Sequence, residues 1–120
     1  MKTKDLTQQD FENALKKINQ PGGKQLEFLR LHAHAIGRAS TMRRLAEQVG
    51  YKNWRGMNLR YGWIAQKIGE AAGLNKPDIK ILVEFVPPKG FSKEDNISNL
   101  DWILVMREPF AKAMEAAEWI

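Results

Sequence analysis

Hydrophobic side chains recur every three or four positions through the first 73 residues, which is the spacing of one face of an α-helix. Residues that cap or interrupt helices divide this pattern into four segments. We therefore predict helices over Leu6–Ile18, over Lys24–Ala35, over Met42–Val49, and from the Asn53 cap to Gly73.

The first two predicted helices have well-marked ends. Thr7 precedes the first one, and Asp10 stands three positions later, which is the pattern of a capping box. Proline and paired glycines over residues 20–23 end that helix. The second helix ends before Gly37, and its wide apolar band indicates burial between other elements.

The next two predicted helices are separated by a short turn. Ser40 or Thr41 caps the third helix, and Gly50 ends it, because glycine adopts the left-handed conformation without steric cost. Asn53 is the predicted cap of the fourth helix. The buried stripe of that helix comprises Met57, Tyr61, Ile64, Ala65, Ile68 and Ala72.

After Gly73 the hydrophobic period changes to two. Apolar residues alternate with other residues from Ile79 to Phe85, and Trp102–Met106 is a second β-prone run, so we predict two strands joined by a long loop. A final helix runs from Pro109 to Trp119. The apolar C-terminus is expected to pack on the domain itself or on a second copy, which makes this helix a candidate homodimer contact.

These elements predict one domain over residues 1–120, mainly α with a small β-hairpin: an α+β fold of about five helices and two antiparallel strands. The two helices and glycine-containing turn over residues 40–73 resemble a helix-turn-helix DNA-binding unit. With the hairpin over 79–107 as a wing and the helix over 109–119, the order resembles a winged-helix domain. That family usually places a branched aliphatic six residues after the turn glycine, where this chain has Gly56 followed by Met57.

The run LAEQVGYKNWRGMNLRYG is also similar to a small bacterial domain associated with restriction-type HNH endonucleases and with short stand-alone proteins of bacteria and phage. The similarity runs through Tyr51, Asn53, Asn58, Leu59, Tyr61 and Gly62. The HNH nuclease motif itself is absent, so the resemblance does not imply nuclease chemistry.

Charge is unevenly distributed along the chain, whose formal net charge is +5. Residues 43–83 carry eight Lys/Arg against three Asp/Glu, a balance of +5, whereas residues 84–120 carry four against seven, a balance of −3. A basic helix-turn-helix is the electrostatic pattern expected of a polyanion binder. Many proteins are mildly basic, so charge alone does not decide the function.

The helix-turn-helix resemblance implies that the fourth helix enters the major groove of double-stranded DNA. The residues expected to contact base edges are Arg55, Asn58 and Asn53. The residues expected to contact phosphates are Arg43, Arg44, Lys52, Arg60 and Lys67, together with Lys89 and Lys93 on the wing. The expected role is regulation or target recognition in a bacterium or phage.

A protein-interaction module with the same fold is the alternative, for example a phage-encoded inhibitor of a host defence complex. Aromatic and aliphatic anchors dominate protein interfaces, so exposure of Trp54, Leu59 and Trp63 would favour this alternative. The acidic C-terminal third offers a second protein-binding face.

Other classes of function are disfavoured. The chain has no cysteine, and it contains no P-loop, dinucleotide-binding glycine motif or serine elbow. His32 and His34 are two positions apart, so they point to different sides of a helix and cannot chelate one ion together. We therefore expect no enzyme activity, cofactor or metal. The N-terminus lacks an apolar signal region, and the longest apolar runs cannot span a membrane, so we expect a cytoplasmic protein.

Overall fold

The computed structural model describes residues 5–88, 90 and 102–120. Within them the helices are α1 (Gln8–Lys16), α2 (Gly23–His34), α3 (Met42–Val49), α4 (Trp54–Ala71) and α5 (Glu108–Ala116), with 3₁₀ turns η1 (Ile36–Arg38) and η2 (Ile79–Ile81). The strands are β1 (Ala39–Ser40), β2 (Val83–Val86) and β3 (Ile103–Met106). The predicted α+β class with five helices is confirmed.

Helix α1 begins where its capping box predicts. The Asp10 amide donates to the Thr7 hydroxyl at 3.1 Å, and the Thr7 amide donates to the Asp10 carboxylate at 2.9 Å. These two bonds satisfy amides that have no partner inside the helix. The buried face of α1 packs against α5, where the Phe11 and Phe110 rings lie 5.4 Å apart.

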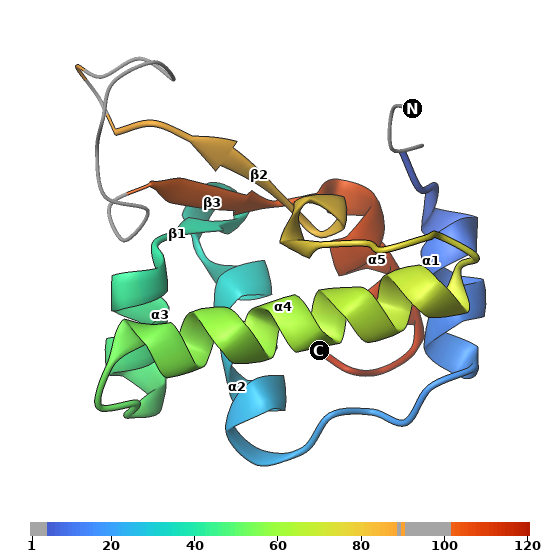
Figure 1. Ribbon diagram of the computed structural model, residues 1–120, viewed down its shortest axis with the longest axis horizontal. Helices are drawn as coiled ribbons and strands as arrows, with labels where there is room; N and C mark the ends of the chain where they lie inside the picture. The colour runs from blue at the N-terminus through green and yellow to red at the C-terminus, as the bar shows by residue number, and fades with distance from the viewer. Residues whose placement is uncertain (1–4, 89, 91–101) are drawn as a thin grey trace.

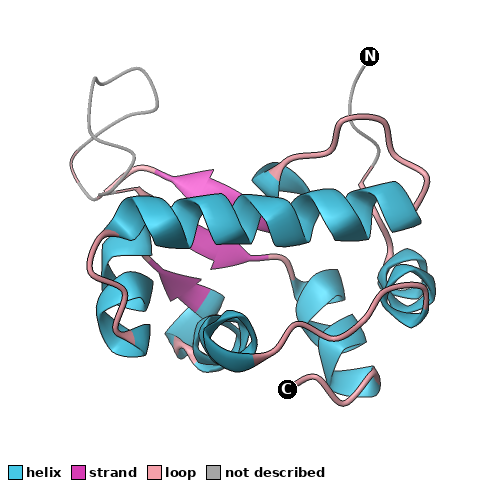
Figure 2. Ribbon diagram, turned by 60° about the horizontal axis from the view of Figure 1, so that its bottom comes forward, coloured by secondary structure: helices cyan, strands magenta, loops and turns pink. Residues whose placement is uncertain are grey.

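Helix α4 is the longest described element, and it buries the stripe that its sequence predicts except for Ala72, the half-buried C-cap. Met57, Tyr61 and Ile68 have no exposed surface, and Ile64 is 5% exposed. Figure 1 shows α4 running the length of the molecule, with α3 at its N-terminal end and α1 and α5 near its C-terminal end. Figure 2 shows the three strands side by side behind α4. Helix α4 is thus the element on which the others are arranged.

The sheet has the order β1-β3-β2, and both pairings are antiparallel. Phe85 and Ser40 flank Leu104 from the two sides, which fixes the register. Leu104 and Met106 are fully buried and face the helices, because side chains two apart in a strand share a face. The predicted pairing of two C-terminal strands is therefore confirmed, and a third strand is present.

Two predictions about this sheet were wrong in detail. Residues 79–81 form η2 instead of a strand, because the Asp78 carboxylate caps the turn by accepting the Lys80 amide at 2.8 Å. Ile81, Leu82 and Val83 are all buried, and three consecutive buried side chains do not fit the alternation of a strand with one buried face. Strand β1 was not predicted, since two residues carry no readable period.

The C-terminus packs within the chain. Trp119 is 4% exposed, its amide donates to Met114 O at 2.8 Å, and Arg30 Nε donates to Trp119 O at 2.8 Å. The structure therefore confirms the expectation that the C-terminus packs on its own domain. A homodimer through α5 stays a prediction. In the described residues, no helix combines the length and hydropathy needed to cross a membrane.

Candidate nucleic-acid interface

The turn between α3 and α4 is set by local interactions. Gly50 has a φ of 81°, in the left-handed region, and the next amide, that of Tyr51, donates to Ala46 O at 2.9 Å. Asn53 then caps α4, its Oδ1 accepting the Gly56 amide at 3.1 Å. These contacts fix where α4 begins, and Met57, one position after Gly56, supplies the buried side chain of its first turn.

Two cations lie over the ring of Tyr51 in this turn. Lys24 Nζ is 5.1 Å and Arg60 Cζ is 5.3 Å from the ring centroid, both within the range of cation–π attraction. Arg60 also donates to Gly56 O at 3.3 Å, and it is half-buried. Its guanidinium is therefore held beside α4.

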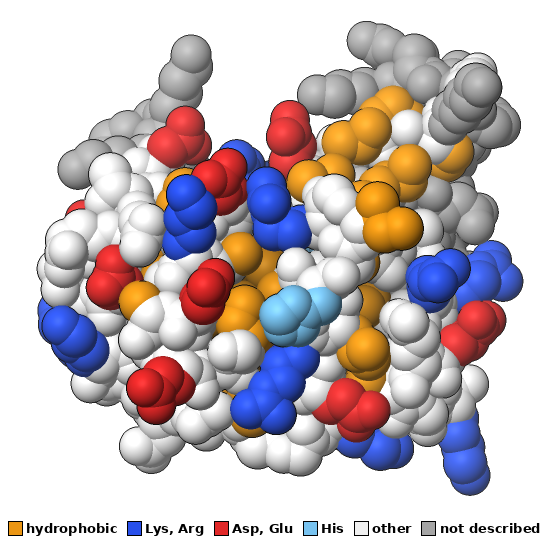
Figure 3. All heavy atoms as spheres, turned by 180° about the vertical axis from the view of Figure 1, so that it is seen from behind, with side chains coloured by type: hydrophobic (Ala, Val, Ile, Leu, Met, Phe, Trp, Pro, Cys, Tyr) orange, Lys and Arg blue, Asp and Glu red, His pale blue; other side chains and the backbone are white. Residues whose placement is uncertain are grey.

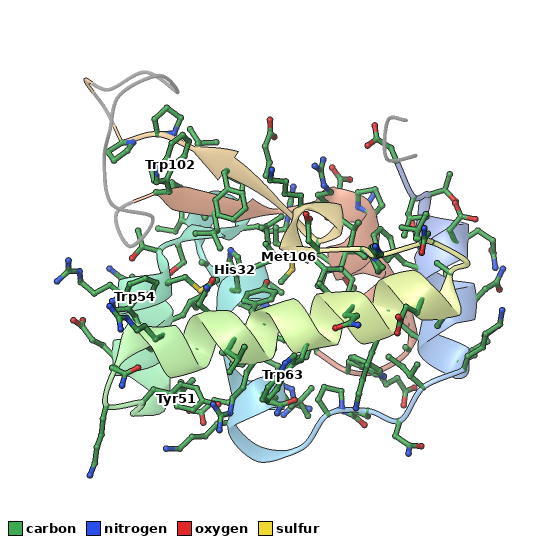
Figure 4. The ribbon with its side chains drawn as sticks, viewed as in Figure 1. His32, Tyr51, Trp54, Trp63, Trp102 and Met106 are labelled. Carbon is green, nitrogen blue, oxygen red and sulfur yellow. The ribbon has the colours of Figure 1, made fainter. Side chains whose placement is uncertain are left out.

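The outward face of α4 combines one cation with two apolar side chains. Arg55, Leu59 and Trp63 follow one another at intervals of four residues, so they form one stripe along the helix. Leu59 is 51% exposed and Trp63 is 50% exposed. Trp63 lies on the side of α4 away from the sheet (Figure 4). This stripe can contact either DNA or another protein.

The predicted base-contacting residues occupy different positions. Arg55 and Asn58 are both exposed, and the Asn58 side chain makes no hydrogen bond with any described residue. Asn53 is exposed, but its carboxamide oxygen already caps α4. A bidentate contact to adenine uses both the oxygen and the nitrogen of the amide, so Asn58 is better placed for one than Asn53.

Of the predicted phosphate-contacting residues that the structure describes, Arg43 and Arg44 lie in the first turn of α3, Lys52 lies in the α3–α4 turn, and Arg60 and Lys67 lie along α4. Arg43, Arg44, Lys52 and Lys67 are exposed, and Arg60 is half-buried. Lys89 and Lys93 lie outside the described residues. From residue 41 to residue 69 there are six Lys/Arg and one Asp/Glu, Glu47. The reverse face of the molecule instead mixes acidic and basic side chains (Figure 3).

A pocket of about 760 Å³ opens between the N-terminal half of α4 and the sheet. Trp54 and Asn58 line it from α4, and Phe85 lines it from β2. Trp102, which directly precedes β3, completes the aromatic wall. Figure 4 shows Trp54 near the start of α4 and Trp102 near the ends of β2 and β3. Sequence reasoning missed this pocket, because its walls come from segments that are far apart in the chain.

His32 belongs to the core and is remote from the outward face of α4. Its Nδ1 lies 2.8 Å from the Tyr61 hydroxyl, and its Nε2 lies 2.8 Å from Leu104 O. A carbonyl can only accept, so Nε2 carries the proton and Nδ1 accepts from Tyr61. Burial lowers the pKa of His32 below 6.5 and raises the pKa of Tyr61 well above its usual value.

This pair has a structural role, since each buried polar atom in it is satisfied. His34 is exposed and His32 is buried, so the two side chains lie on different sides of α2, as their spacing predicts. Among the residues that the structure describes, no group of three or more histidine, aspartate or glutamate side chains is arranged to hold a metal ion.

Comparisons with known proteins do not assign the chain to a family: no family model matches, and neither curated proteins nor solved structures include a match.

Proposed function

We propose that this chain is a single winged helix-turn-helix domain that binds double-stranded DNA, with α4 in the major groove. The observation that carries the proposal is the excess of six Lys/Arg over one Asp/Glu in α3, the turn and most of α4. Phosphate contacts supply most of the non-specific affinity of a DNA-binding protein, so such a surface is favourable for a polyanion.

The order of elements supports the same proposal. The helices α3 and α4 are joined by a turn whose glycine is left-handed, and an antiparallel β2–β3 pair follows them. Strand β1, just before α3, completes the sheet beside β3. In a helix-turn-helix the second helix contacts bases through its N-terminal residues, and Arg55 and Asn58 occupy the second and fifth positions of α4.

Binding would proceed through two kinds of contact. The exposed cations Arg43, Arg44, Lys52 and Lys67 would sit against phosphates and set the orientation of the domain. Arg55 would donate both hydrogen bonds to one guanine, and Asn58 would pair with one adenine. Leu59 would contact a thymine methyl group. Lys89 and Lys93, on the segment between β2 and β3, remain proposed wing contacts. The role would be regulation or target recognition in the cytoplasm of a bacterium or phage-infected cell.

The exposed Leu59 and Trp63 favour a second candidate, a protein-interaction module such as a phage-encoded inhibitor of a host defence complex. Each is about half exposed, and they lie one turn apart on α4. Apolar and aromatic anchors of this kind carry much of the binding energy at protein interfaces. Trp54 contributes less to this surface, because it is half-buried in the pocket.

Substitutions on α4 and α3 separate specific from non-specific DNA contacts. We expect Arg55→Ala and Asn58→Ala each to weaken binding to a preferred duplex by about 1–3 kcal/mol and to change binding to random duplexes little. Arg44→Ala should weaken binding to all duplexes alike, because phosphate contacts carry no sequence information. Fluorescence anisotropy on a selected duplex and on a scrambled one measures both effects.

The two candidate functions predict different results in the same assay. Absence of wild-type binding to any duplex at low salt would contradict the DNA proposal. In that case Trp63→Ala, which removes an exposed side chain without opening the core, would be compared with the wild type for capture of protein partners from the native host.

A further inference from the structure

The pocket between α4 and the sheet has the size and composition of a ligand site. Its volume of about 760 Å³ lies within the range of small-molecule pockets, about 300–1,000 Å³. Three aromatic side chains from three separate segments line it: Trp54, Phe85 and Trp102. The Phe85 and Trp102 rings meet edge to face, with centroids 6.5 Å apart. Half-buried aromatic rings of this kind present surfaces on which a flat ligand can stack.

The polar side chains of the pocket balance one another. The residues that line the pocket include two basic ones, Lys80 and Arg107, and two acidic ones, Asp78 and Glu84, so neither sign of charge is in excess among them. Arg107 is held in place, since its Nε donates to Lys80 O at 2.9 Å. A pocket without net charge does not favour a free phosphate or an isolated ammonium group. It suits a neutral ligand that carries both donors and acceptors.

A nucleobase has these properties. It is flat and neutral at pH 7, it stacks on aromatic side chains, and its edge offers adjacent donors and acceptors. Asn58 lines the pocket, and its carboxamide makes no hydrogen bond with the described residues, so it can pair with such an edge in the pocket in place of a base in the groove. We propose that this pocket binds one nucleobase that has left the base stack.

This inference rests on the proposed function, because a bound DNA duplex would be the source of the nucleobase. Asn58 belongs both to the exposed surface of α4 and to the pocket wall, so an extruded base beside a duplex bound on α4 could reach it. Taking a base out of a duplex costs least where it is already unpaired. A free nucleoside carries the same ring and is the other source of this ligand.

The test compares three short duplexes of the same sequence by fluorescence anisotropy: fully paired, with one bulged adenine, and with an abasic residue in place of that adenine. We expect the bulged duplex to bind about tenfold more tightly than the paired one, as stacking of one base allows. The abasic duplex should lose that advantage. 2-Aminopurine at the bulge should lose fluorescence on binding, because stacking quenches it.

Variants locate the effect in the pocket. Trp102→Ala should abolish the preference for the bulge and leave affinity for the paired duplex unchanged, whereas Trp102→Phe, which keeps an aromatic face, should retain the preference. If Trp102→Ala fails to fold, as judged by circular dichroism, Trp102→Leu keeps an apolar side chain without an aromatic ring. Trp63→Ala is the matched control, because Trp63 does not line the pocket; it should change all three affinities by the same factor.

The outcomes separate this inference from the proposed function. Equal affinity for the paired and bulged duplexes would overturn the inference and leave DNA binding in place. Saturable binding of adenosine in isothermal titration calorimetry, lost in Trp102→Ala and retained in Trp102→Phe, would support the pocket even if no duplex binds; the base would then come from a free nucleoside. Absence of both duplex binding and nucleoside binding would overturn both proposals.

Discussion

His32 is neutral in the fold because it is buried, and its two hydrogen-bonding partners fix which ring nitrogen carries the proton. It is fully buried among α2, α4 and β3, where Nε2 faces the Leu104 carbonyl and Nδ1 faces the Tyr61 hydroxyl. Protonation would place a charge where water cannot solvate it, and burial is the largest cause that lowers the pKa of His32. The pair therefore links stability to pH.

We expect the free energy of unfolding to decrease as pH falls below about 6.5, the pKa of an unfolded histidine. Below that pH the unfolded chain binds a proton that the folded chain does not, so acid favours unfolding. The slope should approach at most about 1.4 kcal/mol per pH unit, until the pH reaches the lowered pKa of the folded state. Urea denaturation at a series of pH values above pH 5 measures it.

His34 provides the matched control for this measurement. It is exposed on the same helix, so His34→Gln should leave the slope near pH 6 unchanged, whereas His32→Gln should remove it. A wild-type slope that is the same in both variants would show that other groups cause the pH dependence.

The glycines of α4 have different surroundings, and packing requires a glycine at one of them, Gly69. A Cβ at Gly69 would collide with Pro77 and approach Ile81 Cδ1 to 2.9 Å, so Gly69 lets the chain that follows α4 pack closely against it. A Cβ at Gly62 would have no neighbour within 4 Å. Gly69 is thus explained by packing, and Gly62 by nothing in the described structure.

These surroundings predict opposite effects of the same substitution. We expect Gly62→Ala to stabilise the protein by up to about 1 kcal/mol, because alanine favours the helix. We expect Gly69→Ala to destabilise it by about 1–3 kcal/mol, since Pro77 and Ile81 must move. Thermal denaturation of both variants beside the wild type measures the difference. A stabilised Gly69→Ala protein would contradict the packing of η2 against α4.

Basic side chains lie on several elements of the described structure. Of those expected to contact phosphates, Arg43 and Arg44 lie at the start of α3, Lys52 in the turn and Lys67 in the C-terminal part of α4, whereas Lys112 lies on α5. On α5, Lys112 is paired with Glu108 at 2.8 Å, and this lysine also lowers the pKa of the Glu108 carboxyl. The arrangement predicts which lysines contribute to binding a polyanion and which do not.

If α4 and α3 contact phosphates, binding should weaken steeply with salt, by about 0.9 log units per log unit of salt for each phosphate neutralised. Lys67→Ala should reduce that slope by about one, because one contact is lost. Lys112→Ala on α5 is the control and should leave the slope unchanged. Anisotropy titrations at two or more salt concentrations suffice, and equal slopes for the wild type and Lys67→Ala would remove Lys67 from the interface.

Local interactions explain what could be predicted from the sequence. Each helix end that was predicted depends on residues only a few positions apart, so it can be recognised in the sequence. These ends are the capping box of Thr7 and Asp10, the helix terminus at Gly50 and the Asn53 cap. The period of 3.6 likewise identified the buried stripe of α4. The base- and phosphate-contact residues were chosen by the same reading and stay predictions.

Three features depend on contacts between residues that are distant in the chain, and only the tertiary structure reveals them. Strand β1 exists because Ala39 and Ser40 pair with Val105 and Leu104, and two residues show no period of their own. Residues 79–81 alternate like a strand, yet they form η2, which Asp78 caps and which places Ile81 against Gly69 of α4. The aromatic pocket has the same origin: Trp54 and Trp102 line it together because α4 packs on the sheet, which no local pattern encodes.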